Sequence, residues 1–184
     1  RLAVALSSIW RSRGPLGQGR ALLERALSLE AGPPRDRLTA MEALAKILFL
    51  QGAFAESARV GEAMVAMARE QHEPLFVAQG LVIIGEGVDR VAGSEGDPAA
   101  ANQYYHEALA VYRQIGDAFH EADTLSQLAE HAWNHGNVAE FAARAEEALV
   151  IYRRLDNAGG VIASLDRLSL AARVSALAAC VALV

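Results

Sequence analysis

The chain has 184 residues, of which 53% are apolar and 21% are charged, and its formal net charge is −5. This composition can fill a continuous core, which excludes a disordered chain. The acidic balance and a single lysine exclude a clustered basic surface for direct nucleic-acid contact. One cysteine excludes an internal disulfide and favours a reducing, cytoplasmic setting.

Alanine and leucine dominate, and runs of β-branched and aromatic residues are sparse, so the pattern favours helices over strands. In chain order we expect helical hairpins over residues 1–32, 36–72, 75–116 and 118–157, with a partial one over 160–184. No low-complexity linker divides them, which indicates one domain over 1–184. The abrupt start and the apolar end suggest a piece excised from a larger protein.

Each hairpin is expected to turn at a glycine, because glycine adopts the left-handed conformation that ends a helix without steric cost. These turn residues are Gly14, Gly52, Gly96 and Gly136. Asp97-Pro98 then predicts a helix start, with an aspartate cap and a proline in the first helical position.

Residues 107–117 recur as 147–157, a self-similarity at 40 residues that is typical of repeat architectures. In both copies the apolar residues fall three and four apart and draw one stripe along a helix. The tyrosines of these stripes could form a ligand platform, but their spacing favours core packing. They are Tyr104, Tyr105, Tyr112 and Tyr152.

Small residues recur where paired helices would touch. In the first helix of each hairpin the small position is Ser7, Ala45, Gly85, Ala129 and Ser169. In the second helix it is Gly19, Ser57 and Ala101, but Phe141 breaks the pattern, so that hairpin must open or compensate. The bulky position of the first helix is also broken once, by Ala132.

This pattern of small and bulky residues around a turn glycine resembles the tetratricopeptide repeat (TPR), with a spacing near 40 residues instead of 34. The resemblance implies an all-α, right-handed α-solenoid of antiparallel hairpins, with about four repeats and a partial fifth. More narrowly, residues 10–27 resemble a segment of bacterial multidomain signalling ATPases and LuxR-type transcriptional regulators. Neither a phosphate-binding Gly-rich motif nor a basic helix pair for DNA is present, so only a coupling part of such a regulator is expected.

In the resembled fold the first helix of each hairpin lines a concave groove. The resemblance implies that the partner-binding residues there are Arg11, Glu42, Lys46, Phe49, Glu86, Asp89, Ser126, Glu130 and Trp133. Phe49 and Trp133 among carboxylates would suit an extended peptide or a helix with apolar and cationic groups. A solvated face with two half-buried aromatics explains the pattern equally well.

No enzyme is expected, because no group of residues meets the geometric roles of a catalytic site. Ser126 and Ser164 lack a nucleophile-elbow context, and paired carboxylates fit a solvated helix face. His131 and His135 have the helical spacing of a zinc-enzyme pair, yet the intervening residues include no glutamate base. Two polar residues near a turn is the simpler interpretation, and we predict no metal and no cofactor.

The predicted function is therefore a signal-coupling module that binds a protein, a peptide or other domains of its parent chain. The alternatives are an effector sensor for small molecules or peptides, and a structural spacer or oligomerisation scaffold. The apolar run 174–184 is shorter than the ~20 residues of a membrane span. It predicts a terminal solenoid helix, through which copies of the chain could associate.

Overall fold

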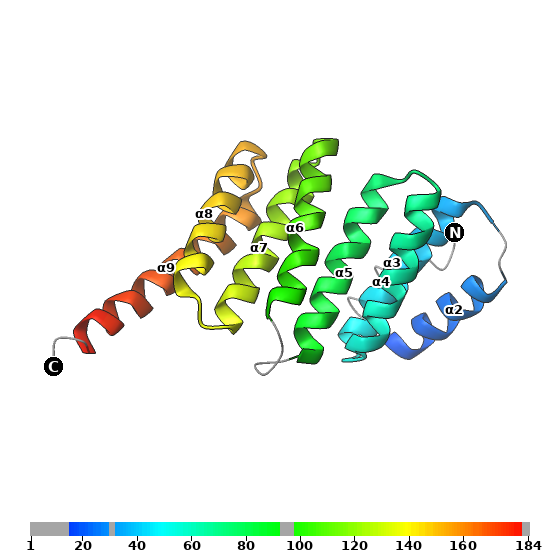
Figure 1. Ribbon diagram of the computed structural model, residues 1–184, viewed down its shortest axis with the longest axis horizontal. Coiled ribbons are helices and arrows are strands. Elements are labelled where there is room, and N and C mark those ends of the chain that lie inside the picture. Colours follow the sequence, from blue (N-terminus) through cyan, green and yellow to red (C-terminus); the bar gives the residue numbers. More distant parts are fainter. Residues whose placement is uncertain (1–14, 30–31, 93–97, 182–184) are drawn as a thin grey trace. The chain divides into compact units, whose positions relative to one another are not determined.

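A computed structural model describes residues 15–29, 32–92 and 98–181. All regular elements of these residues are helices, shown in Figure 1. Their bounds are α2 (Leu16–Ser28), α3 (Pro34–Leu50), α4 (Phe54–Glu70), α5 (Pro74–Ala92), α6 (Pro98–Ile115), α7 (Ala118–Asn134), α8 (Val138–Arg154) and α9 (Ala158–Val181). Among them, none has both the length and the apolar character needed to cross a bilayer.

Backbone contacts divide the chain into two compact units, Arg1–Val111 and Tyr112–Val184. The boundary falls within α6, so the last turn of this helix belongs to the second unit. The single domain predicted from the sequence stays a prediction.

Left-handed residues end the helices where the sequence predicts turns. Gly52 and Gly136 have φ values of 76° and 75°, which confirms two of the four turn glycines. Gly14 and Gly96 lie outside the described residues. His72 and Asp156 adopt φ values of 54° and 52° at the ends of α4 and α8, so non-glycine residues take the same role there.

The helices of the second unit begin with capping side chains that the sequence analysis did not single out. The side chains of Asp117, Asn137 and Asn157 each accept a hydrogen bond from the backbone N–H three residues later, at 3.1, 3.1 and 2.9 Å. These bonds satisfy donors that would otherwise lack a helical partner at the starts of α7, α8 and α9.

In the first unit, small residues let α3 and α4 pack closely, as the sequence predicts. Ala45 and Ser57 are both buried. The Ser57 hydroxyl donates to the Ala45 carbonyl oxygen at 2.9 Å, so the small side chain also supplies a hydrogen bond between the helices. Gly85 lies under the ring of Tyr105, where an added Cβ would be 3.1 Å from the ring.

Glycines bring α4 and α5 close together. A Cβ on Gly61 would lie 3.1 Å from the carbonyl oxygen of Gly80. A Cβ on Gly87 would lie 2.9 Å from the carbonyl oxygen of Phe54. Since α4 and α5 belong to successive predicted hairpins, this contact of near-bare backbones joins one hairpin to the next. We refer to Gly61, Gly80 and Gly87 as the glycine seam.

In the second unit, the large Phe141 is accommodated by an exchange of sizes. Phe141 is 3% exposed at a position where a small residue is expected, and Ala132 is 3% exposed where a bulky one is expected. Both belong to one core cluster with Ala129 and Ala171. The phenylalanine ring therefore fills the space that the alanines leave, and the predicted compensation comes from within the core.

Helix α9 packs on α8 from its first turn as far as Ala171. Gly160 lies against the ring of Tyr152, so close that an added Cβ would be 2.3 Å from the ring Cγ. Farther along α9, Ser169 is exposed, although the sequence analysis assigned it to a helix contact. In the described part of the chain no helix covers it. Exposed large apolar residues of α9 are Ile162, Leu165, Leu170 and Leu177.

Candidate partner-binding surface

The predicted surface residues of α3 form an ion pair and an aromatic cluster. Lys46 donates to the carboxylate of Glu42 one turn earlier, and both side chains are partly exposed. Phe49, near the end of the same helix, is half-buried. Its ring meets the edge of Phe54 with centroids 5.1 Å apart.

Helix α5 contributes a cation to this cluster that the sequence analysis missed. The guanidinium carbon of Arg90 lies 5.8 Å from the centroid of the Phe49 ring, within the range of a cation–π contact. Arg90 is exposed, whereas Glu86 and Asp89, the predicted residues of α5, are half-buried. The first unit thus brings an aromatic ring and charges of both signs together. Arg11 lies outside the described residues.

In the second unit, Ser126 is buried and takes part in a core hydrogen bond with Tyr152. Burial raises the pKa of Tyr152 above its ordinary value, and the bond with Ser126 opposes this rise. Ser126 therefore positions a core side chain, and little of it is available to a partner.

Glu130 and Trp133 remain accessible on α7. Glu130 forms an ion pair with Arg167 of α9, a cation that the sequence analysis did not connect to it. Trp133 is 37% exposed, and its ring packs on Phe141 with centroids 5.0 Å apart. One side of the indole is thus held by the core while the rest faces solvent.

A further aromatic residue lies on the same face of α7. Phe119 is 48% exposed and precedes Trp133 by 14 residues, a spacing of nearly four helical turns. The two rings stand at opposite ends of the helix, roughly 21 Å apart along its axis at 1.5 Å per residue. The spacing of Phe119, Ser126, Glu130 and Trp133 could have revealed this line from the sequence. We call the three exposed residues of this line, Phe119, Glu130 and Trp133, the α7 face.

The second helices of the hairpins carry arginine–glutamate pairs. In the first unit, Arg20 of α2 pairs with Glu56 of α4 at 2.7 Å. Arg69 of α4 pairs in the same way with Glu107 of α6, also at 2.7 Å. These exposed pairs join helices of successive hairpins, and each contributes little to stability because solvent screens the charges.

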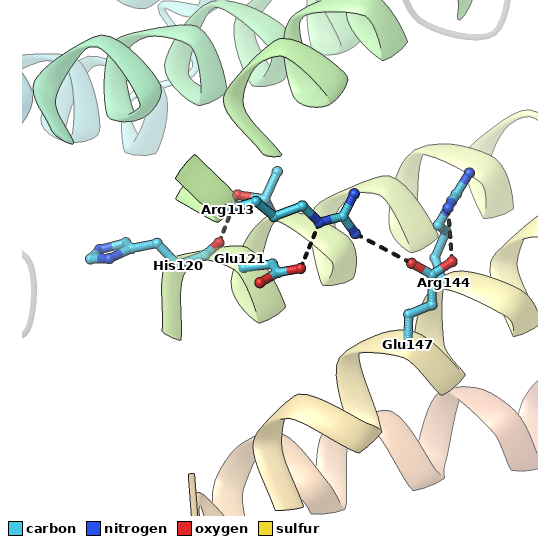
Figure 2. A network of polar contacts seen from close by, with 6 residues as sticks. Arg113, His120, Glu121, Arg144 and Glu147 are labelled. Carbon is cyan, nitrogen blue, oxygen red and sulfur yellow. Dashed lines mark hydrogen bonds and ion pairs between the residues drawn. The ribbon is translucent and has the colours of Figure 1, made fainter. Parts of the chain in front are cut away.

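The second unit has a related network, drawn in Figure 2. Arg113 donates to Glu121 at 2.7 Å and also approaches Glu147 of α8 to 3.7 Å. Arg144 completes it by donating to Glu147 at 2.8 Å. The charged side chains of the second helices are thus paired with one another. The exposed aromatic groups for a partner lie instead on the α7 face.

The chain is similar to solved structures of TPR-like repeats. Nearly identical TPR-like repeats of a kinesin-light-chain-like protein from Podosopora anserina superpose with a TM-score of 0.72 at 16% identity, covering 96% of this chain and 87% of that one. The fold is TPR-like. BtubC (BKLC) from P. vanneervenii gives a TM-score of 0.70 at 17% identity, covering 95% of this chain and 79% of that one. No protein-family model matches the TPR-like chain, and no curated protein is similar to it in sequence.

The TPR-like fold confirms the predicted all-α solenoid of helical hairpins. Its right-handed course stays a prediction. In this fold α3, α5 and α7 are the first helices of their hairpins, so most of the predicted residues lie on equivalent elements of the TPR-like repeats.

Proposed function

We propose that this TPR-like chain is a non-catalytic interaction module that binds a protein or peptide segment along the first helices of its hairpins. The observation that carries the proposal is Trp133, a large aromatic side chain that is 37% exposed yet braced against Phe141. A braced aromatic loses little conformational freedom on binding, which is why such residues often dominate interface energies.

The α7 face suits an extended or helical segment with two apolar anchors. Phe119 and Trp133 can each receive one anchor, and Glu130 lies between them. Glu130 is 49% exposed even while paired with Arg167, so it can accept a further cation from a partner. We infer a partner segment with apolar groups at both ends and a Lys or Arg between them.

This proposal predicts which variants lose binding. Peptides selected from a random displayed library on the intact chain should bind about tenfold or more weakly to a Trp133→Ala/Glu130→Gln variant, since an interface anchor is typically worth more than about 1.4 kcal/mol. Phe119→Ala should weaken the same peptides. Fluorescence anisotropy of labelled peptides measures each affinity.

Val150→Ala is the matched control, because Val150 is an apolar residue of α8 that is 55% exposed and lies off the α7 face. It should leave the affinities unchanged. Circular dichroism of each variant should retain the wild-type helicity. Equal peptide affinity of wild type and double variant would contradict the proposal, and so would a loss of helicity in the double variant, because the α7 face would then be part of the core.

We further propose that the parent protein is a cytoplasmic bacterial regulator or signalling ATPase, in which the module couples a binding event to other domains. The support is the resemblance of residues 10–27 to a segment of LuxR-type regulators. Sequencing the complete reading frame tests this proposal: a phosphate-binding loop before the repeats and a helix-turn-helix after them are expected. A parent protein without either domain would contradict it.

Helix α9 supports a second contact, between copies of the chain. Leu170 and Leu177 are exposed, and residues 174–181 carry no charge that would repel an identical helix. We expect the apparent mass in light scattering to rise with concentration. Leu177→Glu should keep the chain monomeric, because each copy would then bring a charge into the contact.

Val150→Glu, which adds a charge at another exposed apolar residue, on α8, is the control and should associate like the wild type. A wild-type chain that stays monomeric over the whole concentration range would contradict self-association through α9.

A further inference from the structure

The last turn of α7 carries two histidines whose rings lie against each other. His131 and His135 are one helical turn apart, and their ring centroids are 4.6 Å apart with the planes inclined by 58°. A nitrogen of one ring lies within 4.8 Å of a nitrogen of the other. The two histidines that are four residues apart in the sequence thus have neighbouring imidazole rings in the structure.

These distances are close to those of a shared metal ion. Zinc binds imidazole nitrogen at about 2.0–2.1 Å in tetrahedral geometry, which separates two ligand nitrogens by roughly 3.4 Å. The partly exposed His135 side chain is the one that would turn to reach this separation, since His131 is buried. Two imidazoles from one face of a helix would supply two of the four positions of such an ion.

The surroundings favour a cation at this position. His135 follows the last residue of α7 and its backbone N–H still bonds to the carbonyl oxygen of His131, so both rings stand at the carboxyl end of the helix. The aligned backbone dipoles of the helix give this end a partial negative charge that attracts cations. This environment is independent of the ring geometry and points to the same class of ligand.

The burial of the pair also suits a binding site. His131 is 6% exposed and is held among the packed residues of α7, whereas His135 is partly open to solvent. An ion can approach from the side of His135, and the fixed ring of His131 loses little freedom when it binds.

We propose that His131 and His135 form a bidentate site for a divalent transition metal of the zinc, copper and nickel class. Imidazole is a preferred ligand of these ions, while magnesium and calcium prefer oxygen. A bound ion would link His131, in the last turn of α7, to His135, the residue that follows the helix. It would hold this turn next to Trp133, which lies between the two histidines in sequence.

Calorimetric titration of the intact chain with Zn²⁺ tests the site. All variants should carry Cys180→Ser, because Cys180 is exposed and a thiolate is itself a zinc ligand. At a slightly alkaline pH, where ordinary imidazoles are neutral, we expect one equivalent of Zn²⁺ per chain. His135→Gln removes one ligand at the accessible end and should weaken binding about tenfold or more.

His106→Gln is the matched control, because His106 is an exposed histidine of α6. It should bind Zn²⁺ like the parent chain. Zn²⁺ should also raise the melting temperature of the parent chain and of His106→Gln, but not that of His135→Gln. Equal zinc affinity of His135→Gln and the parent, or loss of binding in His106→Gln, would overturn the proposal.

Discussion

Replacing Gly160 by alanine is expected to destabilise the second unit by about 1–3 kcal/mol, the usual cost of overpacking a core. The new Cβ would lie 2.3, 2.4 and 2.6 Å from three ring atoms of Tyr152. The ring cannot move aside easily, because Tyr152 is 5% exposed and its hydroxyl is bonded to Ser126. Alanine favours a helix over glycine by only about 0.5–1 kcal/mol, so the clash decides the sign.

The neighbouring glycine provides the control. A Cβ on Gly159 would meet only Asn157 Oδ1, at the ordinary contact distance of 3.6 Å. Gly159→Ala should therefore be neutral or slightly stabilising. Denaturant unfolding of the two variants, followed by far-ultraviolet circular dichroism, measures the difference. If both glycines tolerate alanine equally, α9 does not lie on Tyr152 as described.

The second large effect is expected at the glycine seam of the first unit. Gly80→Ala would place a Cβ 2.6 Å from Val65 Cγ2 and 3.2 Å from the carbonyl oxygen of Gly61. The methyl of a buried valine can shift only by forcing the helices apart, so we expect a loss of about 1–3 kcal/mol. The measured quantity is the free energy of unfolding from denaturant titration.

A double-mutant cycle with Val65→Ala tests the cause. Val65→Ala alone should also destabilise, because Val65 is 6% exposed and a cavity remains. In the double variant the alanine at 80 would occupy part of that cavity. The combined loss should then be smaller than the sum by about 0.5–3 kcal/mol.

Gly17→Ala serves as the reference for helix propensity, because a Cβ there meets nothing within 4 Å. It should stabilise the chain slightly. Strict additivity of Gly80→Ala and Val65→Ala would show that the two side chains do not meet, and the close approach of α4 and α5 would then be wrong.

The repeat architecture could be predicted from the sequence because it depends on local patterns. Helical periodicity, turn glycines and small positions such as Ala45 and Ser57 each act within one hairpin and leave a regular trace in the chain. The residues that broke the pattern were harder to interpret. Phe141 and Ala132 were both recognised as departures, but only their packing in one cluster shows that each compensates for the other.

The candidate site was predictable only to a limited extent, for a similar reason. The pattern placed Glu130 and Trp133 on an accessible helix, and both are exposed. The pairing of Glu130 with Arg167, and of Phe49 with Arg90, joins residues of different hairpins. Such contacts depend on the register between neighbouring repeats, which no single helix encodes. Ser126 shows the opposite case, since its helical position does not reveal that Tyr152 occupies its hydroxyl.

The glycine seam has a consequence for how this protein can be divided. The sequence repeats end between α4 and α5, near His72, and a designer who shuffled repeats would cut there. That cut would separate a pair of backbones in near contact and expose Gly61 and Gly80 to water. Modules recombined from this protein should therefore keep α4 and α5 together as one exchangeable block. This block begins one helix later than the repeat unit defined by the sequence.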